Sequence, residues 1–262
     1  MLKYLSSPNN QELKRLRLLF EKSKERKKQG LFVIEGLREI EKAVLGGYKL
    51  KTIFIQEGSE SSFSEILKKL NAELIFCIEK SVFDRTSIRS GSEKIIAIAN
   101  TKTHTLEHLN HSNNGIILVV EAPEKPGNIG AIYRTAAAAK INSIIIANPK
   151  TDFYNPNSIR SSLGSVFLVP TALATSFEVI SYLKNKFYRI LTATIETNAL
   201  SYLECSFKKP CAIIMGAESS GLSSPWIAAT DQNLIIPMHE SVDSLNLSVS
   251  AGILMYEAQS RK

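Results

Sequence analysis

Long hydrophobic runs are missing from this sequence of 262 residues. No apolar stretch approaches the ~20 residues that a membrane-spanning helix needs. The N-terminal segment MLKYLSSPNNQELKRL also lacks the continuous apolar core of a signal peptide. We therefore expect a cytoplasmic protein that makes no use of a membrane.

Cysteine and histidine are scarce. The three cysteines, at positions 77, 205 and 211, have neither CxxC spacing nor an even count, which predicts reduced and buried thiols. His104, His108 and His111 lie in a polar, turn-rich segment, where the i,i+4 spacing of the first two could serve a metal. A solvated linker explains the same pattern more simply, so we expect no metal site.

The common nucleotide-binding fingerprints are also absent. Gly127 and Gly130 lie between a predicted strand and a predicted helix, but the G-x-G-x-x-G spacing is missing. No Walker A sequence is present either, so phosphate transfer has no support. An α/β enzyme that uses a nicotinamide cofactor remains only a distant alternative.

Positive charge is present in excess, and it is unevenly distributed. The formal net charge is +7, with 20 Lys/Arg against 14 Asp/Glu in residues 1–110 and 12 against 11 in residues 111–262. An acidic partner such as nucleic acid would therefore be attracted mainly to the first part. Residues 11–28 are predicted to form one amphipathic helix with eight basic residues, and this helix is either a solvated face or a nucleic-acid contact.

Apolar and polar segments divide the chain into two parts. Residues 1–102 alternate short strands and helices and are expected to form a compact α/β unit, followed by a polar linker over residues 103–114. In residues 115–262, apolar runs of four to six residues alternate with helices. This pattern predicts a mainly parallel sheet that helices cover on both faces.

Three loops after predicted strands of the second part are rich in glycine, asparagine or serine. They are PGNIGAIYRT (126–135), MGAESSGL (215–222) and IIPMHESVDSLNLS (235–248). In the third loop, Ser244 and Asn246 could cap a helix or line a pocket. Because loops at the carboxyl ends of parallel strands converge on one crevice, the three loops together are more informative than each one alone.

Together these loops resemble the three motifs of the SpoU/TrmH class of SPOUT RNA methyltransferases. The matching stretches are NxGAIxRTA from Asn128, GAESSGL from Gly216 and IPM…SLNLS from Ile236, in the order that the family shows. The resemblance covers residues 113–262. It extends more loosely to FVIEGLREIEKAV, which is similar to the family's ribosomal-protein-like substrate-binding domain.

The resemblance implies transfer of a methyl group from S-adenosyl-L-methionine to a ribose 2′-hydroxyl in RNA. It implies a SPOUT α/β domain with a deep trefoil knot, preceded by a small α/β substrate-binding domain, and a homodimer whose active site uses both subunits. We expect ribosomal RNA of the large subunit as the substrate, with tRNA as the alternative, and no DNA partner. A non-catalytic RNA-binding assembly factor that keeps the fold is the alternative from another class.

The resemblance also assigns roles to individual residues. The residues implied to hold the cofactor are Gly216, Ile236, Met238, Leu245 and Asn246. Those implied to act in catalysis are Arg134, Asn128, Glu218, Ser244 and Asn246. Because an arginine is normally always protonated, we expect Arg134 to stabilise the developing alkoxide or a neighbouring phosphate instead of acting as a base.

One position departs from the family pattern. Glycine commonly stands two residues after the methionine of the third motif, where this chain has Glu240. Since exposed charge is tolerated in loops, we expect the Glu240 side chain to point to solvent.

Overall fold

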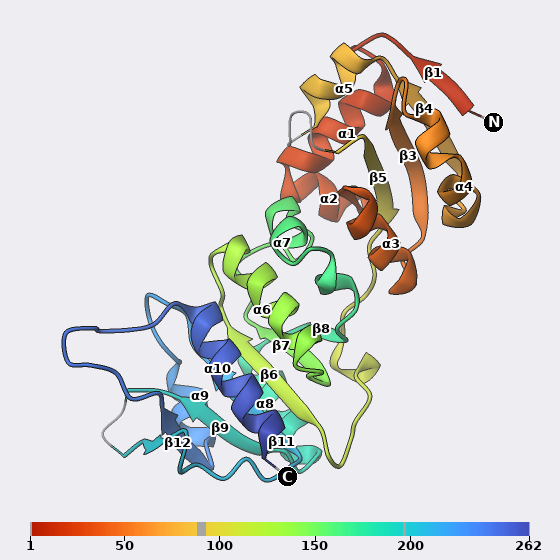
Figure 1. Cartoon of the computed structure of the whole chain (residues 1–262). Coiled ribbons are helices and arrows are strands. Elements are labelled where there is room, and N and C mark those ends of the chain that lie inside the picture. Colours follow the sequence, from red (N-terminus) through yellow and green to blue (C-terminus); the bar gives the residue numbers. More distant parts are fainter. Residues whose placement is uncertain (1, 88–92, 196–197, 262) are drawn as a thin grey trace. The chain divides into compact units, whose positions relative to one another are not determined.

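The computed structural model describes residues 2–87, 93–195 and 198–261. The chain divides into two compact units, each built on its own sheet (Figure 1). The first unit comprises Met1–Lys102 and Tyr154–Leu168, and the second comprises Thr103–Phe153 and Val169–Lys262. The division therefore differs from the boundaries expected from the sequence, because a segment from within the second part belongs with the first unit.

The first unit contains a mixed five-stranded sheet. Its strands, in spatial order, are β1 (Leu2–Leu5), β4 (Leu74–Ile78), β3 (Leu50–Gln56), β5 (Ile95–Asn100) and β2 (Leu31–Glu35). Strand β5 runs antiparallel to both of its neighbours, whereas β1, β4 and β3 are parallel. The helices of its N-terminal stretch that the structure describes are α1 (Gln11–Glu21), α2 (Ser23–Gln29), α3 (Leu37–Leu45), α4 (Glu60–Leu70) and α5 (Lys80–Thr86).

The basic segment 11–28 forms two helices, so the prediction of a single helix is wrong. The break falls at Lys22, whose backbone is extended (φ −115°, ψ 108°). The buried guanidinium of Arg26 donates to the carbonyl oxygens of Leu19, at 2.6 Å, and Phe20, at 3.0 Å. These bonds satisfy carbonyl groups at the end of α1 that have no partner within the helix. The apolar face of α1 is fully buried, as the sequence predicted, through Leu13, Leu16 and Leu19.

The segment Tyr154–Leu168 carries helix α7 (Pro156–Ser161) and packs on the first unit. The ring of Tyr154 stacks on Phe32, with the centroids 4.3 Å apart, and Phe167 contacts Tyr48 edge-on at 5.0 Å. The ammonium of Lys42 donates to the carbonyl of Leu163 at 2.8 Å. Aromatic packing thus attaches this segment to β2 and to the turn that follows α3.

The second unit contains a seven-stranded sheet whose neighbouring strands are all parallel. In spatial order the strands are β10 (Leu200–Ser201), β12 (Gln232–Ile235), β9 (Arg189–Ala193), β11 (Cys211–Met215), β6 (Ile116–Glu121), β7 (Ser143–Ala147) and β8 (Thr171–Ala174). Every residue of β6, β7 and β11 is buried. The expectation of a mainly parallel sheet is confirmed.

Helices cover this sheet on its two faces. Alternate side chains of the central strands, such as Val119, Ile145 and Ile214, join one core with residues of α8 (Ser176–Asn185) and α9 (Ser224–Ala229). On the other face, α6 (Pro126–Ala138) packs against α10 (Leu247–Ser260), and α10 contacts β6 and β11 (Figure 1).

Two local predictions for the second unit need correction. The segment PEKPGNIG was expected to be a loop, but α6 already begins at Pro126, a residue that suits the first position of a helix. Residues 103–114 were expected to be a solvated linker. Instead, Leu106 and Leu109 are buried in the core of the second unit, and the ring of His104 packs on Phe153 with the centroids 4.5 Å apart.

Candidate active site

A cavity of about 750 Å³ lies at the carboxyl edge of the parallel sheet. Its wall is formed by the ends of β9, β11 and β12 and by the loops that follow β11 and β12. This volume lies in the range of ~300–1,000 Å³ typical of small-molecule sites. All of the residues expected to hold the cofactor line it: Gly216, Ile236, Met238, Leu245 and Asn246.

The loop after β11 is a tight turn that leaves no space for a side chain at its start. Ala217 and Gly221 exchange backbone hydrogen bonds of 3.1 and 2.9 Å, and Gly221 has a left-handed backbone with φ +64°. A Cβ atom placed on Gly216 would lie 2.2 Å from the carbonyl carbon of Gly221. Glycine is therefore required at position 216 by the backbone that faces it.

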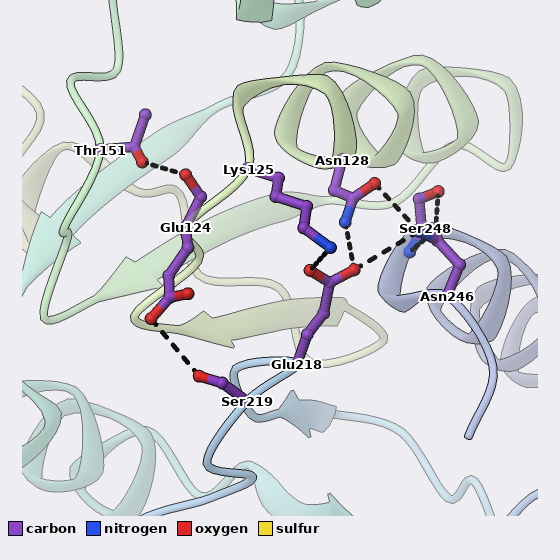
Figure 2. A network of polar contacts seen from close by, with 8 residues as sticks. All are labelled: Glu124, Lys125, Asn128, Thr151, Glu218, Ser219, Asn246 and Ser248. Atoms are coloured by element: carbon purple, nitrogen blue, oxygen red, sulfur yellow. Dashed lines mark hydrogen bonds and ion pairs between the residues drawn. The ribbon is translucent and has the colours of Figure 1, made fainter. Parts of the chain in front are cut away.

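A polar cluster at the mouth of the cavity joins all three expected loops (Figure 2). The first of them contributes through the first turn of α6. Asn128 Nδ2 donates to Glu218 Oε1 at 2.5 Å, and Asn246 Nδ2 lies 3.2 Å from Asn128 Oδ1 and 3.4 Å from Glu218 Oε1. Lys125 Nζ pairs with Glu218 Oε2 at 2.9 Å. The Glu218 carboxylate is thus oriented by two amides and one ammonium that come from distant parts of the chain.

Asn246, in the third loop, both caps a helix and lines the cavity. Its Oδ1 accepts from the backbone N–H of Ser248 at 2.9 Å, which makes Asn246 the N-cap of α10. Its Nδ2 points to the cluster, and the residue lines the cavity. Ser244 also lines the cavity, but it is Asn246 that caps the helix.

Arg134 is the expected catalytic residue that the structure leaves apart from the cavity. It is exposed on α6 and is absent from the residues that line the cavity. Within the described part of the chain, its side chain makes no hydrogen bond or ion pair. A single chain therefore assembles Asn128, Glu218, Ser244 and Asn246 but does not bring Arg134 to them.

Sequence reasoning missed two ionic features beside the cluster. The sequence did not identify Lys125 as a site residue. In the structure, its hydrogen bond with Glu218 raises the pKa of the Lys125 ammonium. Its neighbour Glu124 accepts from Lys150 Nζ at 2.8 Å and lies 3.5 Å from the hydroxyl of Ser219 (Figure 2). The position of these charges directly before Asn128 was the available signal in the sequence.

The remaining expectations concern the departure at Glu240, the metal ligands and the thiols. Glu240 is exposed and is not a lining residue of the cavity. Among the described residues, no group of three His, Cys, Asp or Glu side chains is placed to hold a metal ion. The cysteines are free and buried as expected, and burial raises the pKa of Cys77 to about 12 and that of Cys211 to about 11. No helix in the described ranges is long and apolar enough to cross a membrane.

Comparisons with known proteins agree with this geometry. A model of the SpoU rRNA Methylase family matches residues 115–256, and a model of the MRM3-like substrate binding domain matches residues 10–97. The chain is 28% identical over 240 residues to the 23S rRNA (uridine(2479)-2′-O)-methyltransferase of Streptomyces viridochromogenes, covering 89% of this chain and 84% of that protein. It is 31% identical over 147 residues to the tRNA (guanosine(18)-2′-O)-methyltransferase of Escherichia coli K12, covering 56% of this chain and 64% of that protein.

Solved structures show the same similarity. The structure of the AdoMet-bound rRNA methyltransferase from Sinorhizobium meliloti superposes with a TM-score of 0.90 at 25% identity, and the match covers 99% of this chain and 98% of that one. The expected SPOUT α/β fold with an N-terminal substrate-binding domain is confirmed, whereas the trefoil knot stays a prediction from that fold. The resemblance carried by the three motifs is confirmed, and the chain belongs to the SpoU rRNA Methylase family.

Proposed function

We propose that this protein transfers a methyl group from S-adenosyl-L-methionine to a ribose 2′-hydroxyl of ribosomal RNA in the large subunit. The observation that carries the proposal is the cluster of Asn128, Glu218 and Asn246 at the mouth of a 750 Å³ cavity. It occurs in a chain whose similarity to a 23S rRNA 2′-O-methyltransferase extends over most of both proteins.

The cavity residues fit the cofactor chemically. Ile236, Met238 and Leu245 supply an apolar wall suited to adenine, and Gly216 allows a ligand to approach the backbone. When bound, S-adenosyl-L-methionine supplies an electrophilic methyl group on a sulfonium. Transfer of that methyl group to the 2′-oxygen of the RNA would leave S-adenosyl-L-homocysteine and release the hydroxyl proton to water.

The chain's own polar residues orient the hydroxyl and stabilise charge as the oxygen loses its proton. Because Glu218 already accepts from Asn128 and Asn246, this cluster holds both amides in a fixed orientation beside the cavity. Arg134 would stabilise the developing alkoxide or an adjacent phosphate.

Arg134 is the reason to propose a homodimer. Its exposure on α6 means that a second copy could bring an arginine to the cluster of the first. The neighbouring helix α10 carries two half-exposed side chains, Val249 and Tyr256 (50% and 54%), that contact with a second copy would cover. Equilibrium sedimentation, together with mixing of an Arg134→Ala chain with a Glu218→Gln chain, tests this arrangement. A shared site restores activity in the mixed dimer, whereas a self-contained site does not.

The first unit is proposed to bind the RNA. It matches a substrate-binding domain model, and α1 and α2 expose Lys14, Lys24, Lys27 and Lys28. Ribosomal RNA is favoured over tRNA because the tRNA enzyme matches only 56% of this chain, while the ribosomal enzyme matches 89%. An enzyme of ribosomal RNA would act in the cytoplasm, which we propose as its location.

Methyl transfer from labelled cofactor to total RNA, followed by mapping of the modified nucleotide, tests the proposed function. A labelled 2′-O-methyl nucleotide in large-subunit RNA supports it, and label in tRNA alone would favour the alternative substrate. The non-catalytic assembly factor predicts no label, together with no heat of binding when the cofactor is titrated into the protein.

A further inference from the structure

Glu121 is a buried acidic residue to which the proposed chemistry gives no role. It is the last residue of β6, and only 4% of its surface is exposed. Burying a carboxylate is costly unless several donors replace the water it loses. The hydrogen-bond donors around Glu121 should therefore indicate which parts of the fold the buried carboxylate holds in place.

Two serines from separate loops supply most of those donors, and Asn148 Nδ2 donates to Oε1 over a longer distance of 3.4 Å. Glu121 Oε1 accepts from the hydroxyls of Ser176, at 2.6 Å, and Ser223, at 2.7 Å. Oε2 accepts from the backbone N–H of Ser223 at 2.9 Å. Burial raises the pKa of Glu121, but the bonds from the two serines outweigh it, and the pKa lies below the ordinary value. The group is therefore ionised at neutral pH.

A second layer of contacts extends this network across the carboxyl edge of the sheet. The Ser176 hydroxyl lies 2.8 Å from Asn148 Nδ2 and 3.1 Å from Trp226 Nε1. Asn148 directly follows β7, Ser176 begins α8 after β8, and Trp226 lies on α9 after β11. One carboxylate at the end of β6 thus connects segments that follow three other strands.

Ser223 is the link between Glu121 and the cavity. Serine at the N-cap of a helix normally uses its hydroxyl to cap that helix. At the N-cap of α9, however, Ser223 makes no such bond and gives both its hydroxyl and its N–H to Glu121. Ser223 directly follows Leu222, and α9 carries Ile227; both side chains line the cavity, whereas Glu121 does not.

We propose that Glu121 is a positioning residue for cofactor binding, acting through Ser223 to fix the part of the cavity wall that Leu222 and Ile227 form. The inference rests on the proposed function, because it assigns the cavity to S-adenosyl-L-methionine. It requires that loss of the carboxylate weakens cofactor binding more than it slows turnover at saturating cofactor, since the cluster around Glu218 does not include Glu121.

The test measures the dissociation constant for S-adenosyl-L-methionine by calorimetry and by the fluorescence of Trp226, the single tryptophan of the chain. In Glu121→Gln, an amide group replaces an oxygen that accepts hydrogen bonds, and we expect the dissociation constant to rise about tenfold. Glu121→Asp keeps the charge and should restore part of the affinity. Ser223→Ala should act in the same direction, and the double variant should be less than additive because the two residues share one interaction.

Tyr133→Phe is the matched control. It removes a buried hydrogen bond to Thr171 (3.0 Å) in the same unit, and neither residue lines the cavity. If Glu121→Gln lowers the melting temperature as this control does and leaves cofactor affinity within about twofold of wild type, the proposal is overturned. Should Glu121→Gln fail to fold, unchanged affinity in Ser223→Ala overturns it equally. Failure of the wild-type protein itself to bind the cofactor would instead refute the proposed function.

Discussion

The two units of this protein present polar and charged side chains in different ways. In the second unit, all neighbouring strands are parallel, so residues as distant in sequence as Asn128, Glu218 and Asn246 converge at one edge of the sheet. In the first unit, the exposed cations of α1 and α2 lie along a helical surface. Phosphate backbones are bound by charge that need not be precisely placed, whereas methyl transfer depends on a few atoms in fixed positions. Changes to the second unit should therefore alter methyl transfer or cofactor affinity and spare RNA affinity. Changes to the first unit should do the reverse.

The largest effect is expected from Glu218→Gln. The amide replaces an acceptor that orients Asn128, Asn246 and Lys125, so we expect the rate of methyl transfer to fall about 10²–10³-fold. Single-turnover assays measure the rate, and RNA affinity should remain within about threefold of wild type. Glu240→Gln removes the same charge from an exposed residue outside the cavity and serves as the control. Equal losses in both variants would contradict a special role for the cluster.

The next effect is expected from Gly216→Ala. Because the added Cβ would lie 2.2 Å from the backbone of Gly221, the loop must move, and cofactor affinity should fall at least about tenfold. Gly127→Ala is the matched control, since a Cβ there meets no atom within 4 Å. Calorimetric titration of both variants decides the matter, and equal affinities would show that the loop does not shape the cofactor site.

Charge removal from the first unit should produce the opposite pattern. When glutamine replaces Lys24, Lys27 and Lys28 in one variant, RNA binding should weaken about tenfold. The slope of log affinity against log salt concentration should become shallower by up to about 0.9 per lost phosphate contact. Cofactor affinity should not change. The control makes the same change in the second unit, at the exposed residues Lys184, Lys186 and Lys208. An unchanged salt slope in the first variant would exclude α2 from the RNA contact.

Arg26 lies in the same basic segment, but its expected effect is on stability. Its guanidinium is buried against the carbonyls of Leu19 and Phe20, so Arg26→Met should lower the free energy of unfolding by about 1–3 kcal/mol. Lys27→Met, at an exposed neighbour, should leave it nearly unchanged. Urea denaturation measures both, and similar stabilities would show that Arg26 does not hold the end of α1.

The smallest effect concerns acid. The pKa of Glu121 is lower in the folded protein than its ordinary value, so its contribution to stability is present at neutral pH and is lost as the pH falls below about 4.5. As the pH is lowered below about 4.5, the melting temperature of the wild-type protein should therefore fall more steeply than that of Glu121→Gln. Parallel slopes would show that Glu121 titrates alike in the folded and unfolded states.

Long and regular features could be predicted from the sequence. The buried strands β6, β7 and β11 have mostly apolar sequences, and the motifs at 215–222 and 235–248 identify two loops that line the cavity. Short elements such as β1 and β10 were missed because four and two residues carry too little pattern. The break at Lys22 has no proline or glycine to mark it, and Arg26, which stabilises it, looks like any other cation of a basic helix.

Two features of the site required the structure itself. Glu121 is the last residue of an apolar strand, and nothing in the neighbouring sequence indicates partners at positions 176 and 223. Arg134 belongs to a family motif, and only the structure shows that it lies apart from the other expected catalytic residues. Contacts between residues far apart in sequence decide both cases, and periodicity contains no information about them.

The segment Tyr154–Leu168 limits where the chain can be truncated and how the first unit can be exchanged between genes. Because the chain returns to the first unit there, the polypeptide passes between the units three times. A fragment ending at Lys102 would lack Tyr154 and Phe167 and would leave the aromatic faces of Phe32 and Tyr48 uncovered. The first unit could not be exchanged by a single recombination event at the apparent boundary, since two separate stretches of gene encode it.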